Sequence, residues 1–253
     1  MEFVYSFVAV LVLAGIHVSA GVVRRIPMSI RPTVASLAAG ISVSWVFLEL
    51  LPSLTEHQHT VEGAGLLPAL ERHVYIAALV GLVIAFWVET ASRSSRRENF
   101  EAGGEAVTSV STFWLSLAGF TVFNASIGYA LADPVDPAVT PFWIFVIAMG
   151  LHFLANDESM VENHGIRYER VGRWMLIAGL LAGWIIGRVP KYDLDGAGLA
   201  LVLSYIAGGM IMNIMRHELP VTSRTVNALA FAVGAFVFGV LVLLFAPEAA
   251  TVG

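Results

Sequence analysis

Long apolar stretches, separated by shorter polar ones, run through the whole chain. Each is about 18–24 residues long, which at ~1.5 Å per helical residue is enough to cross a hydrocarbon core of ~30 Å. Eight such segments are predicted, near residues 2–22, 32–52, 73–92, 109–131, 140–159, 172–189, 195–215 and 223–246. The pattern therefore predicts an all-α, polytopic membrane protein in which residues 1–253 form a single transmembrane domain.

The amino-acid composition agrees with this prediction and limits the chemistry. Hydrophobic residues make up 57% of the chain and charged residues 13%, whereas a soluble domain is about 45–50% apolar and about one-quarter charged. The chain has no cysteine, which excludes disulfides and thiolate metal sites. No basic stretch precedes the first apolar segment, so we expect a retained helix rather than a cleaved signal peptide.

The basic residues indicate how the segments are oriented. With the N-terminus outside and eight crossings, eleven of the 14 lysines and arginines fall in loops on the inner side. Arg72, Arg188 and Lys191 are the three that fall outside. Because positive charge gathers on the cytoplasmic side of membrane proteins, we expect a multi-pass protein of the cell membrane with both termini outside.

Two of the predicted segments share a sequence pattern. The second contains "AGISVSWVFLELLP", from Ala39 to Pro52, and the seventh contains "AGGMIMNIMRHELP", from Ala207 to Pro220. In the predicted topology these two segments cross the membrane in opposite directions. Similar sequences in opposite orientation are typical of an inverted-topology repeat, here segments 1–3 against segments 6–8. The alternative is coincidence, since Ala-Gly and Leu-Pro are frequent in membrane helices.

The fifth segment carries the densest group of polar residues, within "MGLHFLANDESM". His152 and Asn156 are four residues apart and share one helix face. Met149 lies on the same face and Asp157 borders it. Imidazole, amide, carboxylate and thioether ligands together suit zinc, iron or manganese. Two alternatives stay open: His152 could bond a backbone carbonyl, and Asp157 could mark the helix end.

Other polar residues at membrane depth are weaker candidates for metal ligands. Asn124 in the fourth segment either binds the ion or holds helices together. Glu49 ends the second segment. In the outer loop predicted for residues 53–72, His57 and His59 either capture metal at the entrance or have no role beyond solvation.

Eight segments, an inverted repeat and polar residues in segments four and five together resemble one family. The chain is similar to the ZIP (Zrt/Irt-like) divalent-metal transporters, over nearly its whole length by topology. "SLAAGISVSWVFLELLPSL" resembles the second helix of that family, and "YIAGGMIMNIMRHELP" resembles the seventh. The fourth helix of the family typically reads His-Asn-x-x-Glu/Asp-Gly. Here "FNASIG" matches at Asn124 and Gly128, while Phe123 replaces the histidine and Ile127 the acid.

The fifth helix of the family typically reads His-Glu-x-x-His-Glu. Here "HFLAND" matches at His152 and, for the second acid, at Asp157; Phe153 and Asn156 replace the other two ligands. The resemblance therefore implies a reduced, single metal site. Its expected ligands are Asn124, His152, Asn156 and Asp157, with Met149, Glu49, His57 and His59 as weaker candidates.

The resemblance implies a carrier that moves zinc, iron or manganese toward the cytoplasm by alternating access. The metal would be the transported ion, zinc first among the three, and no cofactor would be permanently bound. The expected partners are the bilayer and the metal ion, with no nucleic acid, and a homodimer is left open. The main alternative is a non-transporting protein of the same fold, a sensor or assembly partner, which the losses at Phe123, Ile127 and Phe153 favour.

Two other functions are less well supported by the residues. An intramembrane zinc hydrolase needs about three protein ligands and a water, and a di-haem carrier needs paired axial histidines. His152 and His17 are the deep histidines predicted for this chain, and His17, like Asn227, is interpreted as a packing or interface residue. We therefore expect no enzyme activity.

Overall fold

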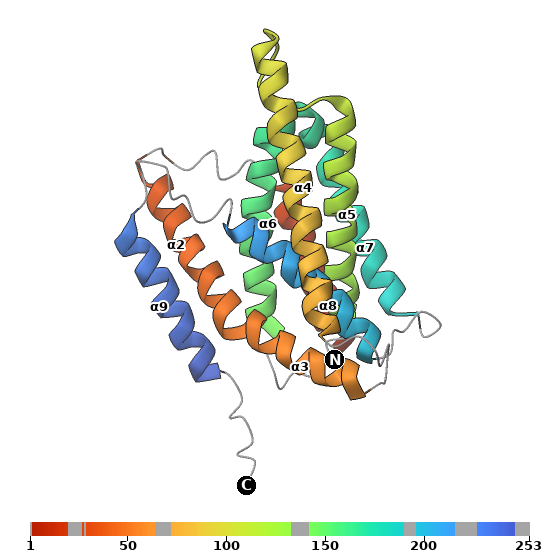
Figure 1. Ribbon diagram of the computed structural model, residues 1–253. Coiled ribbons are helices and arrows are strands. Elements are labelled where there is room, and N and C mark those ends of the chain that lie inside the picture. Colours follow the sequence, from red (N-terminus) through yellow and green to blue (C-terminus); the bar gives the residue numbers. More distant parts are fainter. Residues whose placement is uncertain are drawn as a thin grey trace.

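The computed structural model describes residues 2–19, 27, 29–63, 72–132, 142–189, 196–215 and 227–245. In these parts of the chain the regular structure is entirely helical, which confirms the predicted all-α class (Figure 1). The elements are α1 (Glu2–Val18), α2 (Arg31–Trp45), η2 (Val46–Leu50), α3 (Leu51–Gly63), α4 (His73–Glu101), α5 (Val110–Ala132), α6 (Phe142–His164), η3 (Tyr168–Gly172), α7 (Arg173–Gly187), α8 (Gly196–Asn213) and α9 (Ala228–Phe245).

Several helices have the length and composition of membrane spans. Among the described residues, five runs are long and apolar enough to cross a bilayer: Pro32–Glu62, His73–Glu101, Val110–Ala132, Phe142–His164 and Tyr168–Gly187. The shorter helices α1, α8 and α9 are also apolar. Large apolar side chains such as Phe236 and Leu243 are more than 70% exposed. Such surfaces are compatible with a protein that spans a membrane.

Two predicted loops are largely helical instead. The predicted loop 53–72 is wrong up to residue 63, because α2, η2 and α3 form one run. Pro52 lies in the first turn of α3, and the wide π-helical turn η2 before it gives the ring room without ending the helix. The predicted loop 93–108 is wrong up to Glu101, since α4 continues there and is supported by the Arg97–Glu101 pair at 2.7 Å.

The helices pack in two kinds of group. α1 packs against α5, α6 and α7, and α5 packs closely against α7; we call these helices the four-helix group. α4 pairs closely with α8, and α2 pairs closely with α9, which Figure 1 shows standing away from the rest. The α4/α8 pair contacts α5, and α2 contacts α6. Both pairs therefore border the four-helix group from outside.

The α4/α8 pair depends on two glycines at its crossing. A Cβ on Gly208 of α8 would overlap the carbonyl oxygen of Ala78 and lie 2.9 Å from the nitrogen of Leu82. A Cβ on Gly81 of α4 would overlap the carbonyl oxygen of Tyr205. The backbones can approach this closely only because neither glycine has a side chain.

The α2/α9 pair has a crossing of the same kind. A Cβ on Gly40 of α2 would overlap the carbonyl oxygen of Phe231 and lie 2.8 Å from the nitrogen of Ala235. A Cβ on Gly234 of α9 would overlap the carbonyl oxygen of Leu37. Both helix pairs therefore cross through one glycine from each partner.

One end of the molecule carries most of the described arginines. Arg96 of α4 binds Glu162 of α6 at 2.8 Å, and Arg167 donates to the backbone oxygen of Thr108 at 2.8 Å. These bonds join the connection between α4 and α5 to the connection between α6 and α7. Six arginines belong to this end, which we call the arginine end: Arg93, Arg96, Arg97, Arg167, Arg170 and Arg173.

Candidate functional site

Four buried polar side chains from four different elements meet inside the four-helix group. They are His17 of α1, Asn124 of α5, Asp157 of α6 and Tyr168 of η3, and each is at most 1% exposed. His17 Nδ1 lies 2.9 Å from Asp157 Oδ1, and His17 Nε2 lies 2.8 Å from Asn124 Oδ1. The Tyr168 hydroxyl donates to Asp157 Oδ1. We call this set the His17 cluster.

The bonds of the His17 cluster determine where its hydrogens lie. Asn124 Nδ2 donates to the backbone oxygen of Phe120 at 2.8 Å, so its Oδ1 is the atom that faces His17. A carbonyl oxygen only accepts, so His17 Nε2 carries a hydrogen. Nδ1 and the Asp157 carboxylate then share one further proton, as imidazolium with carboxylate or as imidazole with acid. The polar atoms of Asn124 and Asp157 are therefore bonded within the protein.

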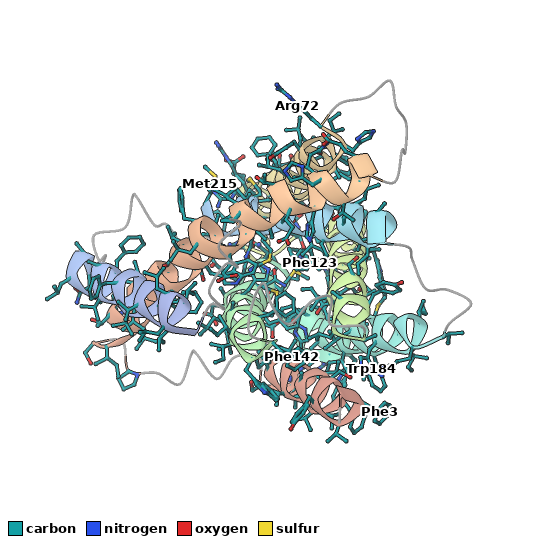
Figure 2. The ribbon with its side chains drawn as sticks, turned by 90° about the horizontal axis from the view of Figure 1, so that it is seen from below. Phe3, Arg72, Phe123, Phe142, Trp184 and Met215 are labelled. Carbon is teal, nitrogen blue, oxygen red and sulfur yellow. The ribbon has the colours of Figure 1, made fainter. Side chains whose placement is uncertain are left out.

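His152 lies on a different side of α6. Its side chain is 2% exposed, and its Nδ1 accepts from Asn213 Nδ2 of α8 at 3.4 Å. Its ring lies 5.4 Å from that of Phe123, which Figure 2 shows at the centre of the molecule. The sequence placed Asn124, His152 and Asp157 in one site. The structure brings Asn124 and Asp157 together through His17 and places His152 with Asn213.

A cavity opens beside His152, between α4, α5 and α8. It holds about 60 Å³ of space open to the centre of a water molecule, and we call it the His152 cavity. One water needs roughly 10–15 Å³ on this measure, so the space suits a few waters or one small hydrated ion. Its walls are mostly apolar, and its polar side chains include Glu89, His152, Tyr205 and Asn213.

The other predicted ligands lie in varied surroundings. Asn156 is 1% exposed, and its Oδ1 has no hydrogen-bond partner among the described residues. Met149 is fully buried in the main apolar core. Glu49 is buried in the π-helical turn η2. None of these three is among the residues that line the His152 cavity.

The two histidines predicted for a flexible outer loop lie on helix α3 instead. His59 is exposed, 3.9 Å from Glu62, and His57 lies two residues before it on the same helix. Gln58 between them accepts from the backbone nitrogen of Val74 at 3.1 Å and so joins α3 to the start of α4. The loop conformation predicted for residues 53–63 is therefore wrong, while capture of metal by these histidines stays a prediction.

Sequence reasoning missed several residues of these two sites. His17 was assigned to packing, although a histidine in an otherwise apolar segment was a usable signal. Tyr168 and Asn213 carried no signal, because their partners lie on other helices. Within the described residues, no three histidine, aspartate or glutamate side chains are grouped to hold one metal ion.

The chain was also compared with known proteins. It matches no protein-family model, and it matches none of the curated proteins. Its function is therefore inferred from its own residues and their geometry.

Proposed function

We propose that this protein is a membrane carrier that moves a divalent metal cation, with zinc the first candidate, by alternating access. One observation carries the proposal: a buried histidine, His152, lines a cavity where the α4/α8 pair meets the four-helix group. A carrier of this kind binds its substrate near mid-membrane, between parts that move against each other. Neutral imidazole is a common ligand of zinc and iron.

The two glycine crossings support an inverted repeat. Leu37 and Gly40 of α2 correspond to Tyr205 and Gly208 of α8 at one constant offset along the chain. On the partner helices, Phe231, Gly234 and Ala235 of α9 correspond to Ala78, Gly81 and Leu82 of α4, again at one offset. π-Helical geometry begins at Val46 in one run and at Ile214 in the other, which also correspond. The second half of the shared sequence pattern, residues 216–220, lies outside the described residues.

The neighbours of the helices support the same repeat. The proposed repeat makes α1 equivalent to α7, α2 to α8, α4 to α9 and α5 to α6. Under these equivalences the α4/α8 pair corresponds to the α9/α2 pair. In the same way, the contact between α5 and α7 corresponds to the contact between α6 and α1. The contact between α2 and α6 corresponds to the contact between α8 and α5. Each of these contacts is present. Segments 1–3 and 6–8 are therefore proposed as the two halves of the repeat.

The arginine end supplies the proposed orientation. Since positive charge favours the cytoplasmic side, this end is assigned to the cytoplasm, and both termini to the outside. α3, with Glu56, His57 and His59, then belongs to the outer side. Uptake toward the cytoplasm would pass from α3 through the His152 cavity to the arginine end.

The non-transporting alternative has an observation of its own. Asn124 and Asp157, two expected ligands, are bonded to His17 and Tyr168. Phe153, at another ligand position, stacks on His17 with ring centroids 4.5 Å apart. A protein whose ligand positions are filled in this way would keep the fold and lose the transport.

Zinc binding and zinc uptake separate these functions. Loss of an outer-shell partner typically weakens metal binding about 10–100-fold, and loss of the ligand itself should cost at least as much. His152→Ala is therefore expected to weaken Zn²⁺ binding at least tenfold in calorimetry and to stop uptake into proteoliposomes. His164→Ala, which changes another buried histidine of α6, is the matched control and should leave binding within about twofold. Equal binding by wild type and His152→Ala would remove the site, and a folded wild type without uptake would select the non-transporting alternative.

A further inference from the structure

A wide groove, open to the surface, lies at the arginine end, and it shares one residue with the His152 cavity. It holds about 510 Å³ open to the centre of a water molecule, and its walls include Arg93, Arg96, Arg97, Ser159, Glu162 and Asn163. We call it the arginine vestibule. Glu89 of α4 lines both this vestibule and the His152 cavity. Glu89 therefore borders both spaces.

A polar stripe on α6 runs along the same route. His152, Asn156, Ser159 and Asn163 follow one another at intervals of four, three and four residues, which places them on one helix face. His152 lines the first cavity, and Ser159 and Asn163 line the vestibule. Asn156, between them, has a buried Oδ1 without a hydrogen-bond partner among the described residues. Asn156 lines neither space, so the stripe reaches the two spaces through His152 at one end and through Ser159 and Asn163 at the other.

The charges of the vestibule do not exclude a cation. Its three arginines each pair with a glutamate: Arg93 with Glu89 at 2.6 Å, Arg96 with Glu162 at 2.8 Å, and Arg97 with Glu101 at 2.7 Å. The pairs cancel in net charge. The side chain of Glu89 is 13% exposed, against 62% for Glu162 and 59% for Glu101. Glu89 is therefore the most deeply placed carboxylate of the three, where screening by solvent is weakest.

We propose that Glu89 is a cation-binding residue on a polar release path from the His152 cavity to the arginine vestibule. The proposal rests on the carrier function above and names the route by which the ion leaves. The cation leaves His152, its charge is compensated by the Glu89 carboxylate that borders both spaces, and it enters the vestibule. Arg93, whose side chain is 54% exposed, can turn to solvent when the cation takes its place on Glu89.

Accessibility to a divalent cation tests the path without requiring transport. The chain has no cysteine, so Ala85→Cys places a single thiol in the His152 cavity, one helical turn before Glu89. Cd²⁺ is added to the protein in lipid nanodiscs, and the ultraviolet cadmium–thiolate band is followed by stopped flow. A unit charge ~6 Å away favours a divalent ion about tenfold even in water. Adding Glu89→Gln to Ala85→Cys should therefore slow the reaction at least about tenfold.

Two controls define the path. Val83 lies two residues before Ala85 on α4 and is 52% exposed. Because this position faces lipid, Val83→Cys should react slowly with or without Glu89→Gln. Glu162→Gln removes another vestibule carboxylate and frees another arginine, and it should change the Ala85→Cys rate by less than about twofold. An unchanged rate in Glu89→Gln, or an equal loss in Glu162→Gln, overturns the role of Glu89.

Zinc uptake by the same variants separates the path from the carrier function. Glu89→Gln removes the carboxylate that lines the His152 cavity and the vestibule, and it should lower Zn²⁺ uptake at least about tenfold. If wild type carries no Zn²⁺ while the Cd²⁺ reaction still depends on Glu89, the carrier function fails and the cation path stands. If wild type carries Zn²⁺ and Glu89→Gln carries it equally well, the path fails and the carrier function stands.

Discussion

Gly208→Ala should separate α4 from α8 and destabilise the protein. The new Cβ would lie 2.6 Å from the carbonyl carbon of Ala78 and 2.9 Å from the nitrogen of Leu82. Both are backbone atoms, so no side chain can turn away and the helices must part. Overpacking of this kind costs about 1–3 kcal/mol. At the adjacent Gly209 a Cβ would meet only the Phe123 ring at 3.5 Å, and alanine gains about 0.8–1.0 kcal/mol of helix propensity.

The gain in helix propensity is common to both substitutions and cancels, so they differ by about 1–3 kcal/mol in the free energy of unfolding. For a chain of this size 1 kcal/mol corresponds to roughly 2–4 °C in Tm, so Gly208→Ala should melt several degrees below Gly209→Ala in the same detergent. Thermal unfolding followed by circular dichroism measures the difference. Equal Tm values would show that α4 and α8 do not cross at these glycines.

Four other outcomes are expected. Gly40→Ala should cost about as much as the substitution in α8, because a Cβ there also overlaps backbone of its partner helix; a cost below about 0.5 kcal/mol would argue against equivalent crossings. His17→Ala leaves the buried oxygens of Asn124 and Asp157 without this partner and should cost at least about 1–3 kcal/mol; a double-mutant cycle with Asp157→Ala should show strong coupling, and additive effects would contradict the bond. Tyr168→Phe should cost about 1.5–3 kcal/mol in the same unfolding assay, the range for a hydrogen bond to a charged group. Asn213→Ala frees the lone pair of His152 Nδ1 that now accepts from Asn213, so Zn²⁺ affinity in calorimetry should be equal or higher; a loss of affinity would contradict this reasoning.

The helices could be predicted from the sequence because each depends on a local pattern. The fourth predicted segment, 109–131, differs from α5 by one residue at each end. The predicted helix ends are wrong where another local interaction outweighs the signal that suggested the end. Pro52 suggested a helix end, but η2 accommodates it, and the charged residues after residue 92 suggested a loop, although pairs four residues apart hold them in α4.

The candidate site could be predicted only in part. Spacing alone places His152 and Asn156 on one face of α6. It cannot show that His17 bonds Asp157, because 140 residues separate them. Nor can it show that Glu89 borders both spaces, since an i,i+4 pair with Arg93 at the end of an apolar stretch is also typical of an ordinary helix exit.

The position of Asp157 on α6 explains why the two buried histidines have separate surroundings. At ~100° per residue, five residues turn Asp157 about 140° away from His152. One side of α6 therefore faces the His152 cavity beside the α4/α8 pair, while the other holds the His17 cluster. That cluster bonds α1, α5, α6 and η3 to one another, so motion among these elements would break buried bonds.

The border between α4 and α5 is held less tightly. Ser92 and Ser116 bond there at 2.9 Å, and Gly119 has only ordinary contact with Val88. If one part of the carrier moves against another, the weaker border is where the movement costs least. The His152 cavity lies at that border. The His17 cluster would then keep the four-helix group rigid. His152 would be the residue whose surroundings change between the outward-open and inward-open states.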